Sequence, residues 1–541
     1  MIDEGRSSAG GAAALASSTS PTPKTAATFD RHYANRVMLL LAGVVLVVLY
    51  IEGMLLPSLP TIASDFHVDA GQVTLIISAY AAAGVALSPV IGKLGDIYGK
   101  RKVMIVVMFT YAASVSVTGF SPNFAFMVGA RTIQGIGLTI MSLGMSLMRE
   151  EFPREMVPRA QGLLSAMFGI GFAISLPLGS WVSQDYGWRT TYHSAVPFVI
   201  IMAVLVFLLV KESPYRRPDT PVDYLGALFL GLSLAGIVTA LSQGEAWGWT
   251  SPMTVGFAAI GLLMAVPFVV VERRLTVQKR EPIVDQRLLR ERNVAVTNIV
   301  LTVAGLGMYL AMFSLIYQFE YPIASGGYNA SCTPLNCSNF QILNAGIDIL
   351  PLAVGMTCFA LVTSVVVSRV GIKPLAFAGG LITALGFVLE AYASTLGVAL
   401  AIEVLIGAGM GLLNASIINL LILTVDPKDM GQATAMNNVF RNVGGSVGAP
   451  IAGSILATYL LTSGPFAGYF PAHLAFQYVY LLAAAITVAG TVTVLFAQEV
   501  LGVRRHAKFA HHPMLPRRGR RAGTAPVPAD PTPAPPLNRG T

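Results

Sequence analysis

The sequence contains little charge. Only 11% of its 541 residues are Asp, Glu, Lys or Arg, and 54% are hydrophobic, whereas about a quarter of an average soluble domain is charged. A water-soluble surface cannot be built from that mixture. The hydrophobic residues gather in runs of about twenty, the length that crosses ~30 Å of hydrocarbon as a helix. The composition therefore excludes a soluble globular protein and predicts an all-α integral membrane protein.

Cysteines and catalytic motifs are also scarce. Three cysteines are too few for a disulfide scaffold. Cys332 and Cys337 share one polar loop, and they are disulfide candidates only if that loop faces an oxidising compartment. The seven histidines fall in tails, loops or ends of apolar runs, and there is no Walker loop, HExxH zinc motif or convincing Ser/His/Asp set. We therefore expect no enzyme activity, cofactor, metal site or ATP-driven transport.

The net charge of +8 is not arranged for nucleic-acid binding. The sequence has no basic helix, no stripe of interleaved aromatic and basic residues and no zinc-finger spacing. We therefore expect the lipid bilayer, and no nucleic acid, as the partner of this chain.

Fourteen apolar runs predict fourteen membrane spans. The expected spans are 37–57, 72–92, 103–120, 124–148, 160–182, 193–210, 224–243, 253–271, 295–318, 343–367, 373–393, 397–423, 435–459 and 475–497. Residues 1–36 and 498–541 lack apolar periodicity and are rich in small residues, proline or arginine, so we expect two disordered tails.

The basic residues of the joints predict the orientation. One alternate set of joints carries almost all of them, and the other set contains only Arg189. The basic set is Lys93, Lys100, Arg101, Lys102, Arg149, Arg154, Arg159, Lys211, Arg216, Arg217 and the arginines and lysine of 273–292. By the positive-inside rule both termini are expected in the cytoplasm, with the chain in the plasma membrane.

An internal repeat predicts two related halves. A shift of 272 residues lays Gly99 on Gly371, Gly135 on Gly407 and Gly137 on Gly409. Two six-helix halves around a central cavity are a common transporter design, in which rocking of the halves alternates access to a midplane site. The expected halves are 37–213 and 275–497, the latter including a cytoplasmic loop, with two extra linker helices at 214–274.

Two motifs contain charged residues, one in the loop after the second span and one within the fourth span. The loop after the second span contains Gly92, Asp96, Gly99, Lys100 and Arg101, in which glycines permit a tight turn and the charges can form a breakable network. We predict a cytoplasmic gate there. The fourth span contains Arg131 followed by Gln134, and an arginine within an apolar span usually faces a cavity or a partner.

Together these motifs resemble the signature loop and fourth-helix motif of the major facilitator superfamily. Three further segments also resemble this superfamily: Trp188–Arg189, residues 244–249 and residues 441–445. The resemblance covers about residues 37–497. The number of spans looks most like the fourteen-helix drug:proton antiporters. The resemblance implies two six-helix bundles with two extra helices between them. It also implies proton-coupled export of small amphipathic or cationic compounds by a monomeric protein.

The glycine pattern departs from that family in the fifth span. Related antiporters have Gly-Pro followed by paired glycines there, but here the stretch reads Ser175-Leu176-Pro177-Leu178-Gly179-Ser180, with the proline displaced by one place. Small-residue packing nevertheless persists in both halves. The expected helix-packing positions are Gly135, Gly137, Gly169, Gly171, Pro177, Gly179, Gly444, Gly445 and Gly448.

The embedded acids are the candidates for proton coupling. Related exporters carry an acid nine residues before the proline that closes the first span; here Ile51 occupies that place and Glu52 follows it. Glu52 either lines the cavity or reaches interfacial water. In the repeat Glu403 corresponds to Arg131, so the two either face each other across the cavity or Glu403 reaches water at the outer end. With Gln134 they form the expected proton-coupling set.

Three further features complete the expectations. Arg441 is expected to bind phosphate head groups or a gate acid, and Glu390 to be solvated. The ninth span is rich in Met and aromatic residues, which suit adaptable binding or face lipid. The competing interpretations are an importer or uniporter of a specific metabolite and, in another class, a membrane receptor.

Overall fold

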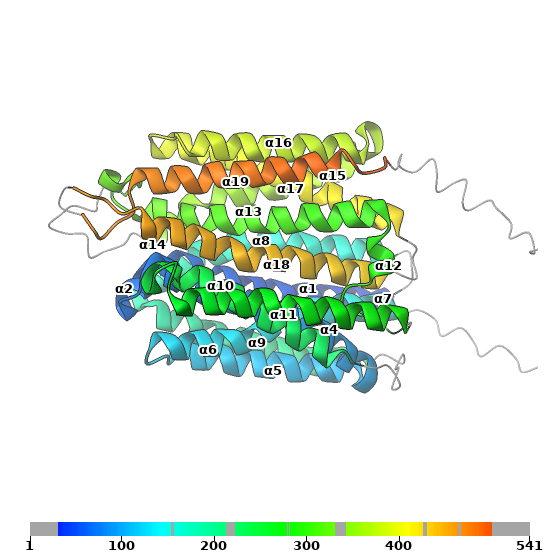
Figure 1. The fold of residues 1–541 in the computed structure, drawn as a ribbon. Coiled ribbons are helices and arrows are strands. Elements are labelled where there is room, and N and C mark those ends of the chain that lie inside the picture. Colours follow the sequence, from blue (N-terminus) through cyan, green and yellow to red (C-terminus); the bar gives the residue numbers. More distant parts are fainter. Residues whose placement is uncertain are drawn as a thin grey trace, which may run out of the picture. The chain divides into compact units, whose positions relative to one another are not determined.

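The protein is a bundle of long helices (Figure 1). The computed structural model describes residues 31–152, 156–212, 222–278, 280, 282–329, 342–425, 430–463 and 467–499. Within them the only β-pairing consists of two isolated bridges, Pro322 with Asn329 and Leu460 with Pro471. The expectation of an all-α membrane protein is confirmed. Cys332, Cys337 and most of both expected tails lie outside the described residues.

The helices fall into three groups along the chain. The first comprises α1 (Arg31–Gly53), η1 (Leu56–Ser58), α2 (Leu59–Phe66), α3 (Ala70–Val73), α4 (Leu75–Tyr98), α5 (Lys100–Gly119), α6 (Phe124–Gln134), η2 (Gly135–Gly137), α7 (Leu138–Glu151), α8 (Val157–Tyr186) and α9 (Trp188–Leu209). The second comprises α10 (Tyr224–Trp247) and α11 (Pro252–Val277). The third comprises α12 (Gln286–Leu289), α13 (Arg292–Glu320), η3 (Ile323–Ser325), α14 (Ile342–Asp348), α15 (Leu350–Val370), α16 (Ile372–Glu390), α17 (Leu396–Thr424), α18 (Met430–Thr458) and α19 (His473–Val494).

A long helix or helix run lies at each of the fourteen predicted positions. Among the described residues, 12 helices or helix runs have the length and hydropathy to cross a membrane. The two other positions are occupied by α8 and α18, of 30 and 29 residues. The third and fourth spans are separate helices, as predicted: α5 ends at Gly119 and α6 begins at Phe124. Asn123 caps the start of α6 by accepting a hydrogen bond from the Phe126 amide at 2.9 Å.

Both tail boundaries differ from the sequence prediction. The first helix begins at Arg31, not after residue 36, and Tyr33 contacts the end of the sixth span. Its hydroxyl accepts a hydrogen bond from the Lys211 amide at 2.8 Å, and the Lys211 ammonium lies 4.8 Å from its ring centroid. At the other boundary Glu499 is bound to α16. Such tertiary contacts extend ordered structure beyond the apolar runs.

The predicted repeat reappears as equivalent contacts in space. A Cβ on Gly135 would meet the Tyr80 carbonyl of α4, and one on Gly407 would meet the Leu352 carbonyl of α15. Tyr80 and Leu352 are themselves related by the shift of 272. The next glycines repeat this, since Gly137 faces Tyr111 and Gly409 faces Thr383, again one shift apart. The glycines thus allow the same pairs of helices to approach closely in both halves.

A second equivalence lies where α5 and α16 begin. Gly99 and Gly371 adopt positive φ angles of 108° and 95°, which glycine adopts at no steric cost. The helix that follows each is capped by a distant carboxylate. Glu212 accepts from the first amides of α5 at 3.1 and 3.2 Å, and Glu499 accepts from those of α16 at 2.9 Å each. These carboxylates satisfy amides that have no partner within the helix.

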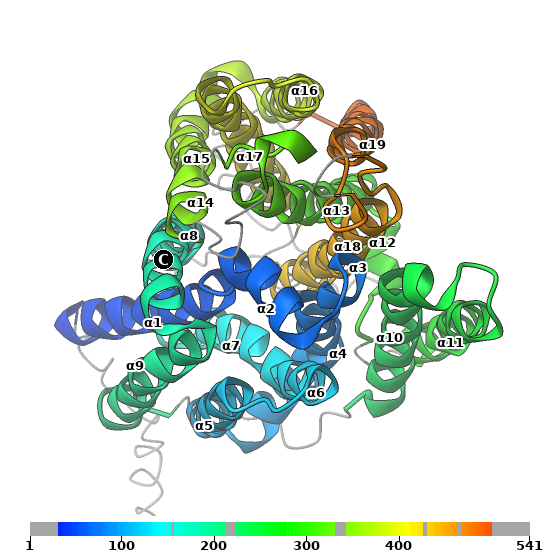
Figure 2. The ribbon, with the colours of Figure 1, turned by 90° about the vertical axis from the view of Figure 1, so that its left-hand side faces the viewer.

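The two ends of the bundle differ in charge. We call the end where α5 and α16 begin the basic end, because it carries residues such as Lys100, Arg101 and Lys373. The other end, where α2, α3 and α14 lie, faces the viewer in Figure 2. There Asp65 accepts a hydrogen bond from the Trp188 indole at 2.7 Å and pairs with Arg189 at 3.4 Å.

The linker helices lie at the side of the bundle. Helix α10 packs against α4 and α18, and α11 packs mainly on α10 (Figure 2). Only 11% of the apolar window of α11 is buried within the protein. Most of this helix therefore faces lipid.

We predict that Glu499→Ala lowers the free energy of unfolding by about 1 kcal/mol, the usual cost of losing a helix cap. Glu291→Ala is the matched control, because Glu291 occupies the N-cap of α13 without a side-chain cap bond. Thermal unfolding of the purified variants measures the difference. Equal stability of the two variants would show that the Glu499 cap contributes nothing.

Candidate functional site

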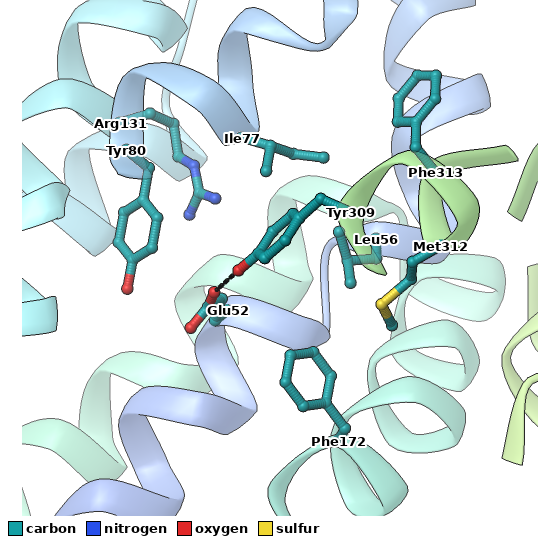
Figure 3. A pocket seen from close by; sticks show the side chains of 9 residues that line it. All are labelled: Glu52, Leu56, Ile77, Tyr80, Arg131, Phe172, Tyr309, Met312 and Phe313. Carbon is teal, nitrogen blue, oxygen red and sulfur yellow. Dashed lines mark hydrogen bonds between the residues drawn. The ribbon is translucent and has the colours of Figure 1, made fainter. Parts of the chain in front are cut away.

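A break in the first span positions Glu52. Helix α1 ends at Gly53, and the chain then turns into η1, where Pro57 lies at the helix start. Glu52 is in the last turn of α1, while its neighbour Ile51 is fully buried. The one-residue displacement from the family position is therefore accommodated where the helix ends, and Glu52 lines a central cavity (Figure 3).

Both halves contribute to this cavity. Its lining residues are Glu52, Leu56, Ile77, Tyr80, Arg131 and Phe172 from the N-terminal half and Tyr309, Met312 and Phe313 from α13. The cavity measures about 10 Å³, which is room for about one water molecule. In this conformation it is too small for an organic substrate, so binding of one requires the halves to move apart.

A hydrogen bond joins the halves at the cavity. The Tyr309 hydroxyl of α13 donates to a carboxylate oxygen of Glu52 at 2.7 Å (Figure 3). The guanidinium groups of Arg131 and Arg441 also interact electrostatically with Glu52. Arg441 comes from α18. The sequence indicated that it binds phosphate head groups or a gate acid, and in the structure it is an electrostatic neighbour of Glu52. The Tyr309 hydroxyl was missed, because the sequence indicated only an adaptable apolar surface there.

Arg131 is held on the N-terminal half. Its Nε donates to the Ile76 carbonyl at 3.1 Å, and its guanidinium lies 4.7 Å from the centroid of the Tyr80 ring. The side chain is 1% exposed. Gln134, one turn further on, is buried against α5, where the Thr118 hydroxyl lies 3.5 Å from its carbonyl oxygen. Gln134 does not line the cavity.

Glu403 does not meet Arg131 in this structure. Its electrostatic neighbours are Glu390 and Asp348, and it is absent from the lining of the central cavity. The repeat explains this placement: Asp348 corresponds to Ile76, the residue that accepts from Arg131. Each of the two charged side chains therefore lies beside the equivalent helix run of its own half, and Arg131 alone also lines the cavity between the halves. The alternative that Glu403 reaches water also fails here, because its side chain is fully buried.

The predicted gate loop forms its network at the basic end. The Lys100 ammonium pairs with Asp96, and Lys100 is 4% exposed. Arg101 donates to the Phe207 carbonyl and lies over the Phe207 ring at 5.1 Å. A Cβ added at Gly92 would have no neighbour within 4 Å, so no close packing requires a glycine there.

The predicted packing residues lie at helix contacts. In α8, Gly171 faces Leu49 of α1 and Gly179 faces Met54 directly after it, while Gly169 faces α15 of the other half. The helix continues through the displaced Pro177.

The glycines of α18 bring two elements of the site together. Gly444 and Gly448 lie against backbone carbonyls of α13, and Gly445 lies against the ring of Tyr309. Helix α13, which carries Tyr309, is thereby held close to Arg441.

The two halves are in contact at the end opposite the basic end. A Cβ on Gly453 of α18 would meet the Ala70 carbonyl and the Gly71 Cα of α3. The Leu343 amide of α14 donates to the Gln184 side chain of α8 at 3.1 Å. Access to the cavity from that end requires these contacts to separate.

The fold and the cavity define a polytopic membrane protein of two repeated halves with charged side chains at their interface. The family model of the Major Facilitator Superfamily matches residues 41–449 and 353–526. The chain belongs to this family of transporters, whose members are not enzymes, and it takes a small-molecule substrate.

Relatives and solved structures agree with this assignment. The chain is 24% identical to the Multidrug transporter protein MdtP of Bacillus subtilis, over 77% of this chain and 75% of the relative. It is 24% identical to the Tetracenomycin C resistance and export protein of Streptomyces glaucescens, over 74% and 71%. The crystal structure of the nucleoside transporter NupG superposes with a TM-score of 0.58 at 15% identity, covering 85% of this chain and 99% of that one.

We predict that Gly453→Val separates the halves at the end opposite the basic end, because the added side chain would collide with α3. Spin labels at cysteines replacing Phe120 and Tyr392, in a background without Cys332, Cys337 and Cys358, would report a longer distance by double electron–electron resonance.

Gly397→Val is the control for this experiment, since a Cβ there has no neighbour within 4 Å. An unchanged distance in Gly453→Val would contradict the assignment of a closing contact to α3 and α18.

Proposed function

We propose that this protein exports small amphipathic or cationic compounds in exchange for protons. The observation that carries the proposal is Glu52, an acid at the interface of the halves that hydrogen-bonds to Tyr309 across it. An acid in that position has different neighbours when the halves separate, so its charge can bias the conformational equilibrium. The names of the multidrug and tetracenomycin relatives support the substrate class.

In the proposed cycle, substrate and proton compete for the same acid. A cationic substrate binds from the cytoplasm beside ionised Glu52, with Met312 and Phe313 offering an adaptable apolar surface. A proton from the outside then neutralises the carboxylate, which weakens attraction for the cation, and the substrate leaves outward. Loss of that proton to the cytoplasm restores the charged acid. The plasma membrane and cytoplasmic termini that this direction requires are supported by the positive-inside pattern.

The Glu403 region offers a second position for a proton. Neither carboxylate oxygen of Glu403 has a hydrogen-bond partner among the described residues, and its charged neighbours Glu390 and Asp348 are both acidic. A buried ionised carboxylate without a donor or a basic partner is costly. We propose that Glu403 moves a proton during the cycle without touching the substrate, because it lies outside the cavity.

We predict that Glu52→Gln abolishes proton flux driven by cationic dyes in proteoliposomes, because the amide cannot ionise. A pH-sensitive dye inside the vesicles measures the flux. Glu245→Gln, at the far end of α10, is expected to retain it. Dye movement without proton flux would replace antiport by a uniporter, and absence of dye movement would favour a carrier of one metabolite.

We predict a different result for Glu403→Gln, because this residue does not line the cavity. The number of protons moved per dye should fall while the dye concentration for half-maximal transport changes less than about twofold, since no substrate contact is lost. The ratio follows from the membrane potential at which net flux stops. An unchanged ratio would remove Glu403 from the proton path.

A further inference from the structure

A second cavity lies at the basic end, outside the central site. It has a volume of about 510 Å³ and is lined by Arg273, Thr276 and Val277 of α11 and by Gln286, Arg287 and Arg290 at α12. The ends of these two helices lie at the same end of the bundle (Figure 1). Half of the lining residues are arginines, so the cavity attracts anions.

The cavity walls are fixed by buried anchors on both sides. The buried Glu272 carboxylate of α11 accepts a hydrogen bond from the Val284 amide at 2.9 Å, which holds Val284 against α11. Leu288 of α12 is 1% exposed and packs in an apolar cluster with residues of α13, α17 and α18. Asp285 begins α12 by accepting from the Arg287 amide at 2.8 Å, and its second oxygen pairs with the Arg287 guanidinium at 3.4 Å. The backbone of α12 is therefore fixed beside the cavity, and Asp285 also positions the Arg287 side chain.

We propose that this cavity binds the phosphate of an anionic phospholipid headgroup. Guanidinium groups bind phosphate with paired hydrogen bonds, and basic pockets at the ends of membrane helices are typical headgroup sites. A lipid source is favoured over free phosphate because α11 exposes most of its length to lipid and ends in Val277, which is 83% exposed. Acyl chains can lie along α11 while the phosphate enters between α11 and α12.

This site gives the linker helices a role independent of transport. A headgroup held by Arg273 on α11 and by Arg287 and Arg290 at α12 bridges the linker to the segment that leads into the C-terminal half. Bound anionic lipid should therefore stabilise the folded protein, since it binds the native arrangement of both helices.

The test uses the full chain in nanodiscs of phosphatidylcholine, with or without phosphatidylglycerol. Native mass spectrometry counts retained lipids, and thermal unfolding reports stabilisation. The wild type is expected to retain phosphatidylglycerol selectively and to unfold at higher temperature in its presence. The variant with Arg273→Gln, Arg287→Gln and Arg290→Gln should lose both effects. Its affinity for phosphatidylglycerol should fall about fivefold for each arginine removed.

Arg274→Gln is the matched control. It removes one positive charge from α11, as Arg273→Gln alone does, but Arg274 does not line the cavity, so it should keep both effects. Equal retention of the two lipids by the wild type, or unchanged selectivity in the triple variant, would overturn the proposal. Inorganic phosphate is added to phosphatidylcholine nanodiscs in a further arm. Stabilisation there equal to that by phosphatidylglycerol would assign the cavity to free phosphate and overturn the lipid assignment.

Discussion

Close contact between helices at glycine is the constraint on which the rest of this structure depends. Helices in a bilayer gain little from burying apolar side chains against each other, so they associate through small residues that let backbones approach. Gly135 and Gly407 allow this at equivalent places in the two halves, each against a carbonyl of the helix two spans earlier. The two halves thus have equivalent helix contacts, and they differ in the charged residues that they carry.

The two halves carry opposite charges at one equivalent position of the repeat. Arg131 and Glu403 occupy one position of the repeat, yet only Arg131 lines the cavity between the halves. The N-terminal half supplies an acid and an arginine to that cavity, and the C-terminal half supplies Tyr309 and a nearby Arg441. Because the Glu52–Tyr309 bond crosses the interface, separation of the halves must break this bond.

Much of the architecture could be predicted from the sequence, because the length of an apolar span is a local property. The fourteen positions follow from span length, the two related halves from the glycines repeated 272 residues apart, and the placement of Glu52 at the cavity from the resemblance to related exporters. The contact of Glu52 with Tyr309 could not, since no local signal pairs residues from different halves. The position of Glu403 outside the cavity has a related reason: a repeat predicts that Arg131 and Glu403 are equivalent positions, but it does not predict that the two side chains meet across the interface. Hydropathy alone also set the limits of the spans too narrowly, since Tyr33 and Glu499 lie in stretches without apolar periodicity and each is held by a partner more than a hundred residues away.

The same kind of polar contact gives the linker helices their place. Helix α11 buries little against the protein apart from its packing on α10. The Glu272 carboxylate adds a polar contact by holding Val284, and Arg287 and Arg290 at α12 line the same cavity as Arg273. Three arginines line this cavity, and Asp285 pairs with Arg287, so the cavity carries net positive charge that attracts an anion. The fold therefore places positive charge beside the end of α11, a helix that exposes most of its surface outside the protein.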